Sequence, residues 1–95
     1  MVNSNIKSVL SMALYLLSYD LRKEGRDYQK LYDELKAFNA VRILESVWCF
    51  NRFKTSCNNL CNYFRQFIDS NDGIIVTEVS DWATCNTDDN PNSLN

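Results

Sequence analysis

The stretch ALYLLSYDLRKEGRD, residues 13–27, passes from nearly unbroken apolar and aromatic residues into an aspartate and then into a basic loop. Alternate residues of a strand lie on opposite faces, and both faces of residues 13–21 are mostly apolar. We therefore predict an inner strand that is covered on two sides. One face ends in a carboxylate, Asp20. The cations of the following loop are Arg22, Lys23 and Arg26.

Length and composition predict one small globular domain: 95 residues, 45% hydrophobic, with two glycines and one proline. The net charge of −2 gives no overall attraction to nucleic acid or membrane, but the charge is unevenly distributed. All Lys and Arg residues lie within residues 1–65, whereas every charged side chain within residues 66–95 is acidic. We divide the chain into an irregular N-terminal extension (1–11), a domain (12–84) and a polar acidic C-terminal tail that frays (85–95). Whether the natural start is Met1 or Met12 stays open.

Beyond the first strand, the apolar pattern predicts a helix, a strand pair, a second helix and a last strand. Each helix has one apolar stripe, with Asp27 as the expected N-cap of the first and Thr55 or Ser56 of the second. The segment VRILESVWCFNRF, residues 41–53, is too long for one typical strand and predicts a bent hairpin or bulged pair. IIVTEV is the last strand, with a further short strand near Trp82 as an open alternative.

This order of elements predicts an α/β (α+β) ferredoxin-like sandwich, with a four-stranded antiparallel sheet and two helices on one face. The helices cover only one face, yet the first strand is apolar on both. We therefore expect a homodimer in which the open face packs on a second copy.

The cysteines and the absence of histidine limit the chemistry. The four cysteines form no paired C-x2-C motif, and Cys57 and Cys61 complete the apolar stripe of the second helix, so we assign them to the core and not to zinc. No histidine is available for a catalytic triad or as a general base. The sequence shows no convincing signal peptide and no bilayer-spanning stretch, so we expect a cytoplasmic protein with reduced thiols and no membrane partner.

Three segments resemble the CRISPR-associated protein two family. LYLLSYDL resembles the first strand of the family, which ends in YD. ESVWCF resembles its SVF hairpin segment, and GIIVTEVS resembles its last core strand. Element order agrees over residues 12–82. Small bacterial relatives of that family share YLxSYDLxKxGxxY and a late DSND, and virulence-associated protein D toxins share the fold and a first-strand aspartate. The resemblance implies a ferredoxin-like homodimer whose first-strand aspartates, here Asp20, help to hold a divalent metal near the dimer axis. Some members of the family cleave RNA or DNA, and others serve as non-catalytic scaffolds.

Asp20 is accordingly our candidate catalytic residue and metal ligand, with Mg²⁺ as the expected ion and Mn²⁺ as a substitute. The alternative is that Asp20 caps a turn or pairs with Arg22 or Arg26 at an exposed strand end. The three cations of the loop are candidates for phosphate contacts. Arg52 and Lys54, interleaved with aromatic residues, are candidates for a second nucleic-acid contact, or else form a solvated rim. Arg42 is a weaker candidate for the same surface.

Two functions remain in view. The first is a metal-dependent nuclease-like homodimer. The second is a non-catalytic interaction module, either a nucleic-acid scaffold or an inhibitor or adaptor that binds a protein partner through acidic surface. Glu24 and Asp27 dilute the basic loop, and the pI near 4.9 weakens duplex binding, so both features favour the second function.

Overall fold

A computed structural model describes residues 11–94 and confirms the predicted order of elements. The predicted N-terminal extension, residues 1–11, lies outside the described residues apart from Ser11. The elements are β1 (Met12–Asp20), α2 (Gln29–Ala37), β2 (Val41–Leu44), β3 (Val47–Phe53), α3 (Cys57–Arg65), β4 (Gly73–Val79) and a 3-10 helix, η1 (Pro91–Ser93).

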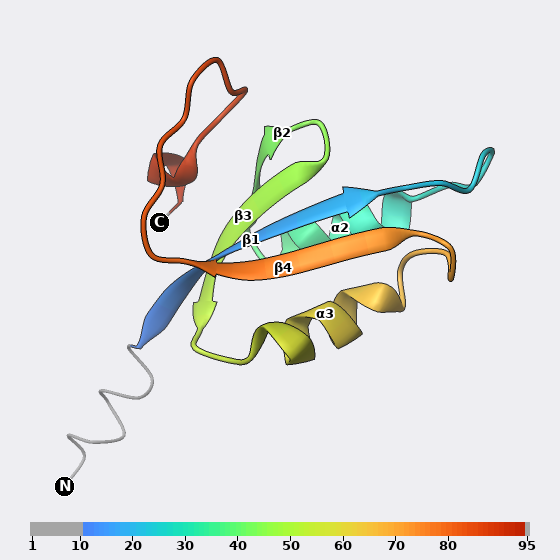
Figure 1. The fold of residues 1–95 in the computed structure, drawn as a ribbon, viewed down its shortest axis with the longest axis horizontal. Coiled ribbons are helices and arrows are strands. Elements are labelled where there is room, and N and C mark those ends of the chain that lie inside the picture. The colour runs from blue at the N-terminus through green and yellow to red at the C-terminus, as the bar shows by residue number, and fades with distance from the viewer. Residues whose placement is uncertain (1–10, 95) are drawn as a thin grey trace, which may run out of the picture.

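The four strands form one sheet in the order β2-β3-β1-β4, and every neighbouring pair is antiparallel. Both helices lie on the same face of the sheet, which confirms the ferredoxin-like prediction (Figure 1). The expected bulged hairpin is also present, because the register between β2 and β3 shifts between Arg42 and Leu44. β1 is thus an inner strand, as its apolar faces predict.

Both helices begin where a side chain accepts an otherwise unpaired N–H group. Ser56 is the N-cap of α3, and its hydroxyl accepts a hydrogen bond from the Asn59 N–H at 3.0 Å. At α2 the backbone places the N-cap at Tyr28, one residue after the expected one. The Asp27 carboxylate still accepts from the Gln29 N–H at 2.9 Å, so it satisfies the first turn as predicted.

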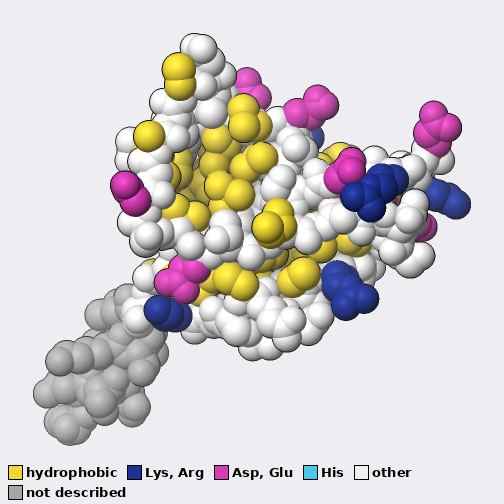
Figure 2. Space-filling view, in the orientation of Figure 1, with side chains coloured by type: hydrophobic (Ala, Val, Ile, Leu, Met, Phe, Trp, Pro, Cys, Tyr) yellow, Lys and Arg dark blue, Asp and Glu magenta, His cyan; other side chains and the backbone are white. Residues whose placement is uncertain are grey.

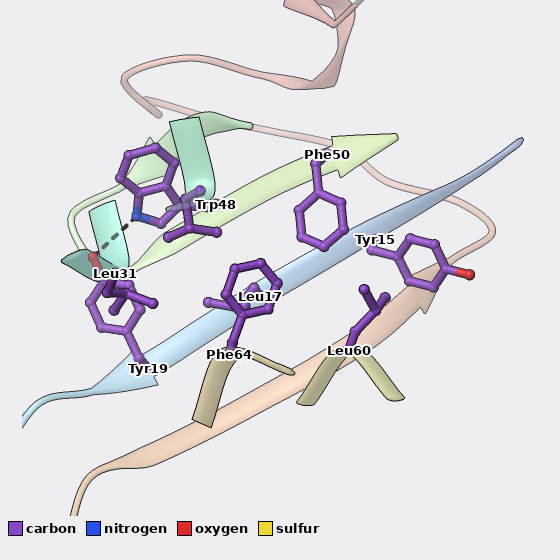
Figure 3. Packing of buried hydrophobic residues seen from close by; sticks show 9 residues of the cluster. Tyr15, Leu17, Tyr19, Leu31, Trp48, Phe50, Leu60 and Phe64 are labelled. Atoms are coloured by element: carbon purple, nitrogen blue, oxygen red, sulfur yellow. Dashed lines mark hydrogen bonds between the residues drawn. The ribbon is translucent and has the colours of Figure 1, made fainter. Parts of the chain in front are cut away.

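The core lies between the helices and the face of β1 that carries Tyr15, Leu17 and Tyr19 (Figure 3). The stripes of the two helices meet these residues through Leu31, Leu35, Leu60 and Phe64. Polar atoms in the core have partners, since the Trp48 indole N–H donates to the Tyr19 hydroxyl at 3.1 Å. The packing anchors β1 and so fixes the position of its last residue, Asp20.

The C-terminal segment, residues 80–94, corrects the prediction of a frayed tail. It turns back toward β2, where the Asp88 N–H donates to the Ile43 carbonyl at 2.9 Å, and then forms η1 (Figure 1). No strand forms near Trp82. Between this segment and the open face of the sheet lies an apolar groove of about 160 Å³. Its lining includes Leu14, Leu16, Ile43, Cys49 and Trp82.

The open face is therefore covered in part by the chain itself. Cys49 on β3 is only 1% exposed, whereas Ile75 on β4 is 62% exposed. Figure 2, which has the same orientation as Figure 1, shows hydrophobic side chains gathered over this open face. None of the helices within residues 11–94 is long and apolar enough to cross a membrane.

Candidate functional site

Asp20 is the last residue of β1 and stands opposite Gly73 of β4. Its side chain is 72% exposed, and its Oδ2 atom accepts a hydrogen bond from Arg22 Nε at 3.0 Å. Within a single chain, Asp20 therefore forms the ion pair with Arg22 that the sequence analysis gave as the alternative to a metal site. An exposed carboxylate carries little desolvation cost, so Asp20 needs no second partner for the protomer to fold.

The Arg22 side chain lies across the turn that leads into β4. Its Nη1 donates to the Asn71 carbonyl at 3.0 Å, and its backbone N–H donates to Asp72 Oδ1 at 2.6 Å. A Cβ atom at Gly73 would lie 3.0 Å from Arg22 Nη2, which is tighter than ordinary contact. Glycine at position 73 therefore leaves room for the guanidinium beside Asp20.

The other two cations of the loop differ in how they are held. Arg26 forms an ion pair with Asp69 at 3.7 Å, and its guanidinium lies 5.4 Å from the centre of the Tyr28 ring. The Lys23 ammonium has no ion pair within residues 11–94, and only its backbone N–H is engaged, by the Tyr28 hydroxyl at 3.3 Å. Lys23 is thus the loop cation most available to an incoming phosphate.

Asp72 joins this loop to the turn between α3 and β4. Its carboxylate accepts from the Arg22 N–H, from the Tyr28 hydroxyl at 2.7 Å and from the Asp69 N–H at 2.7 Å. Partial burial raises the pKa of Asp72, but these hydrogen bonds and the charge of Arg26 outweigh it and leave the pKa below its ordinary value. In the sequence, DSND stood out only as a motif shared with small bacterial relatives of the family, and Asp72 was assigned no role.

A hollow of about 440 Å³ opens beside Asp20 and contains Arg42 in its wall. The Arg42 guanidinium lies 5.1 Å from the centre of the Tyr32 ring and 5.3 Å from that of Trp48, and the two rings are stacked. Its Nε and Nη2 atoms donate to the Glu45 carbonyl at 2.9 and 2.6 Å, and Nη2 also donates to the Tyr19 hydroxyl at 3.3 Å. Arg42 is therefore a pre-ordered cation next to Asp20, which its place on a hairpin strand did not reveal.

The second predicted contact lies toward the other end of β1 from Asp20, and its two cations have partners within the chain. Arg52 stands opposite Ala13, near the start of β1, whereas Asp20 is at its other end. The Arg52 guanidinium lies 4.1 Å from the centre of the Phe38 ring, and Lys54 pairs with Glu78 at 3.4 Å.

The aromatic residues beside these two cations are not available together either. Phe50 is fully buried in the core, and Phe53 lies on the face opposite to Arg52 because neighbouring strand residues alternate. Of the two rings interleaved with these cations, Phe53 alone is therefore exposed, on the face opposite to Arg52.

The side chains that could act as ligands show whether a single chain can hold a metal ion. Among residues 11–94 there is no group of three or more His, Cys, Asp or Glu side chains placed to bind one. Asp20 offers one exposed carboxylate, and Mg²⁺ commonly keeps several waters and takes only one or two protein carboxylates together with phosphate oxygens. The donors therefore fit Mg²⁺ only if a second Asp20 or the substrate completes the set.

Comparison with known proteins identifies the family of the chain. No solved structure matches the chain significantly. The family model described as CRISPR associated protein Cas2 matches residues 12–86, from the start of β1 into the C-terminal segment. The match covers most of the sequence, and the chain belongs to the CRISPR-associated protein Cas2 family.

Proposed function

We propose that this protein is a homodimeric, metal-dependent nuclease that cleaves RNA or DNA, with Asp20 as the metal ligand. The observation that carries the proposal is the position of Asp20, exposed at the end of the central strand between a basic loop and a hollow that contains Arg42. A carboxylate that can bind a metal ion, beside cations that can contact phosphate, supports metal-dependent phosphodiester cleavage.

The open face supports the dimer. Asp20 shares this face with Ser18, which stands opposite the exposed Ile75 of β4. A two-fold axis close to this end of the face would bring the two copies of Asp20 near each other. A second copy packed there would also remove Ile75 from water.

Each side chain then has a defined task. Two copies of Asp20 would hold Mg²⁺, or Mn²⁺ in its place, and such an ion would supply charge neutralisation at phosphate and a more acidic water. Lys23 and Arg42 would contact phosphate oxygens. Arg22 pairs with Oδ2 of Asp20, which leaves Oδ1 to bind a cation, and the positive charge of Arg22 opposes that binding.

A cleavage assay tests the proposal directly. Labelled single-stranded RNA and duplex DNA are incubated with the protein and Mg²⁺ or Mn²⁺, with EDTA as the metal-free control. We expect metal-dependent cleavage that Asp20→Asn abolishes, while Asp88→Asn, a change at an exposed aspartate of the C-terminal segment, retains it. Cleavage that persists in Asp20→Asn, or that is insensitive to EDTA, would contradict the assignment.

The Asp20–Arg22 ion pair favours a second candidate function, a non-catalytic interaction module. In such a protein the pair would serve only to close the strand end, and the protein would act as a nucleic-acid scaffold or as an acidic inhibitor or adaptor. Salt dependence separates these cases. Phosphate binding gives an affinity that falls steeply with salt, with a slope that Lys23→Ala and Arg42→Ala reduce. An intact dimer with no cleavage and no salt-dependent binding would leave the protein-binding module.

A further inference from the structure

We infer that Asp72 is a positioning residue, which fixes the backbone of the basic loop through Arg22 and Lys23 so that their side chains stand beside Asp20. The inference rests on the proposed function for its consequence, phosphate binding, but its structural part stands on the contacts alone. Asp72 lies in the turn between α3 and β4, about half the chain away from the residues that it holds.

The contacts of Asp72 reach the backbone of two of the three cationic residues of the loop. Asp72 Oδ1 accepts the Arg22 N–H at 2.6 Å. Asp72 Oδ2 accepts the Tyr28 hydroxyl, whose oxygen in turn accepts the Lys23 N–H at 3.3 Å. One carboxylate therefore reaches two consecutive backbone amides of the loop, the first directly and the second through Tyr28.

The same carboxylate also organises its own turn. Its Oδ2 accepts the Asp69 N–H at 2.7 Å, and Asp69 in turn pairs with Arg26 at 3.7 Å. The Arg22 guanidinium donates to the Asn71 carbonyl of this turn. The two loops are thus closed against each other by bonds to a charged acceptor, which are stronger than bonds between neutral groups.

The consequence for binding follows from conformational entropy. The loop from residue 21 to 28 is mostly exposed, and among its residues only Tyr28 is buried, so little apolar packing restrains it. A loop held in one conformation has less freedom to lose when phosphate binds, which increases affinity without adding a contact. Asp72 does this without itself approaching the anion.

Amide hydrogen exchange tests the structural part without reference to nuclease activity. In Asp72→Ala we expect the amides of Arg22, Lys23 and Asp69 to exchange about tenfold faster than in the wild type, with core amides unchanged. Tyr28→Phe, a milder change, should speed up Lys23 alone. Asp81→Ala is the matched control, because among the described residues the Asp81 carboxylate accepts only the N–H of the next residue, Trp82. Unchanged exchange at Arg22 in Asp72→Ala, or at Lys23 in Tyr28→Phe, would overturn the inference.

A double-mutant cycle on binding to single-stranded RNA and duplex DNA tests the functional part. Lys23→Ala removes the ammonium but keeps the backbone N–H, so its effect reports the side chain alone. We expect Asp72→Ala to weaken binding about tenfold, and to raise KM more than it lowers kcat. We also expect Lys23→Ala to cost less affinity in the Asp72→Ala background than in the wild type. Equal costs in the two backgrounds would overturn the positioning role. A wild type that neither binds nor cuts would refute the proposed function, while the exchange data would still decide whether Asp72 holds the loop.

Discussion

At the scale of single residues, the Tyr19 hydroxyl links the core to the candidate site. It donates to the Glu45 carbonyl at 3.1 Å and accepts from Trp48 and from Arg42. Burial raises the pKa of Tyr19 against the opposing effects of Trp48 and Arg42, so the neutral hydroxyl persists at physiological pH. One oxygen thus satisfies a buried indole and helps to orient the cation in the hollow beside Asp20.

Tyr19→Phe should therefore lower the free energy of unfolding by about 1–3 kcal/mol, because it leaves the buried Trp48 N–H without an acceptor. The measurement is urea denaturation of the wild type and the variant. Tyr63→Phe is the matched control: its hydroxyl donates to Glu34 at an exposed position, so its removal should change stability by no more than about 0.5 kcal/mol. Equal effects of the two changes would contradict the role assigned to Tyr19.

Sequence reasoning reached Asp20 and its two alternatives because a carboxylate that ends an apolar strand is a local signal. It assigned Asp72 no role, and it placed Arg42 only as a weaker candidate on the surface of Arg52 and Lys54. Each residue has a partner that is distant in sequence: Asp72 bonds to Arg22, and Arg42 bonds to Tyr19 as well as to the nearby Glu45. Such contacts follow from the way loops and strands meet in the fold, which no spacing along the chain records.

At the scale of elements, the helices, the bulged hairpin and the last strand follow local patterns and were predictable. The C-terminal segment was not. Its sequence is polar, without apolar periodicity, and it is held by one backbone bond from Asp88 to Ile43 and by contact with the sheet. Whether such a segment lies on the domain depends on the apolar face that it finds there, here the groove that includes Cys49.

Cys49 can report whether this segment covers the sheet. Burial, with a smaller contribution from the negative charge of Asp89, raises the pKa of its thiol to about 11. Only the thiolate reacts, so Cys49 should be inert toward a disulfide reagent at mildly alkaline pH, while the exposed Cys85 reacts readily. In a chain whose other three cysteines are replaced by serine, deletion of residues 86–95 should make Cys49 react at least about tenfold faster.

The control for this deletion is Asp89→Asn in the full-length chain, which removes the nearby charge but keeps the cover. Because desolvation is the larger cause of the raised pKa, Asp89→Asn should increase the reaction rate much less than the deletion does. If Cys49 stays inert after deletion while circular dichroism shows the fold intact, the segment is not what shields it.

At the scale of the whole molecule, one part of the open face of the sheet is covered by the chain itself and another part is exposed. The C-terminal segment lies over the part that contains Cys49, and Ile75 on β4 remains 62% exposed. The sequence predicted that this face needs a cover, because β1 is apolar on both sides. The sequence could not indicate how much of this face the chain itself covers and how much is left for a second copy, because that depends on where the C-terminal segment folds.

Ile75→Asp tests the part assigned to the second copy. Because the side chain is mostly exposed in the protomer, the change should alter its stability by no more than about 0.5 kcal/mol, while a buried unpaired charge in the interface should abolish dimerisation. Light scattering over a range of concentrations measures the mass. Asn62→Asp, on the exposed face of α3, introduces the same charge on the helix side and should leave the dimer intact.

Dimerisation and cleavage should then fail together. If two copies of Asp20 are needed to hold the ion, Ile75→Asp removes metal-dependent cleavage although its own Asp20 is unchanged. Cleavage by a monomeric Ile75→Asp protein would show that one Asp20 suffices and would contradict the shared site. A wild type that is monomeric at every concentration would mean instead that the exposed part of the face takes a different partner, and Ile75→Asp would then be the variant with which to identify it.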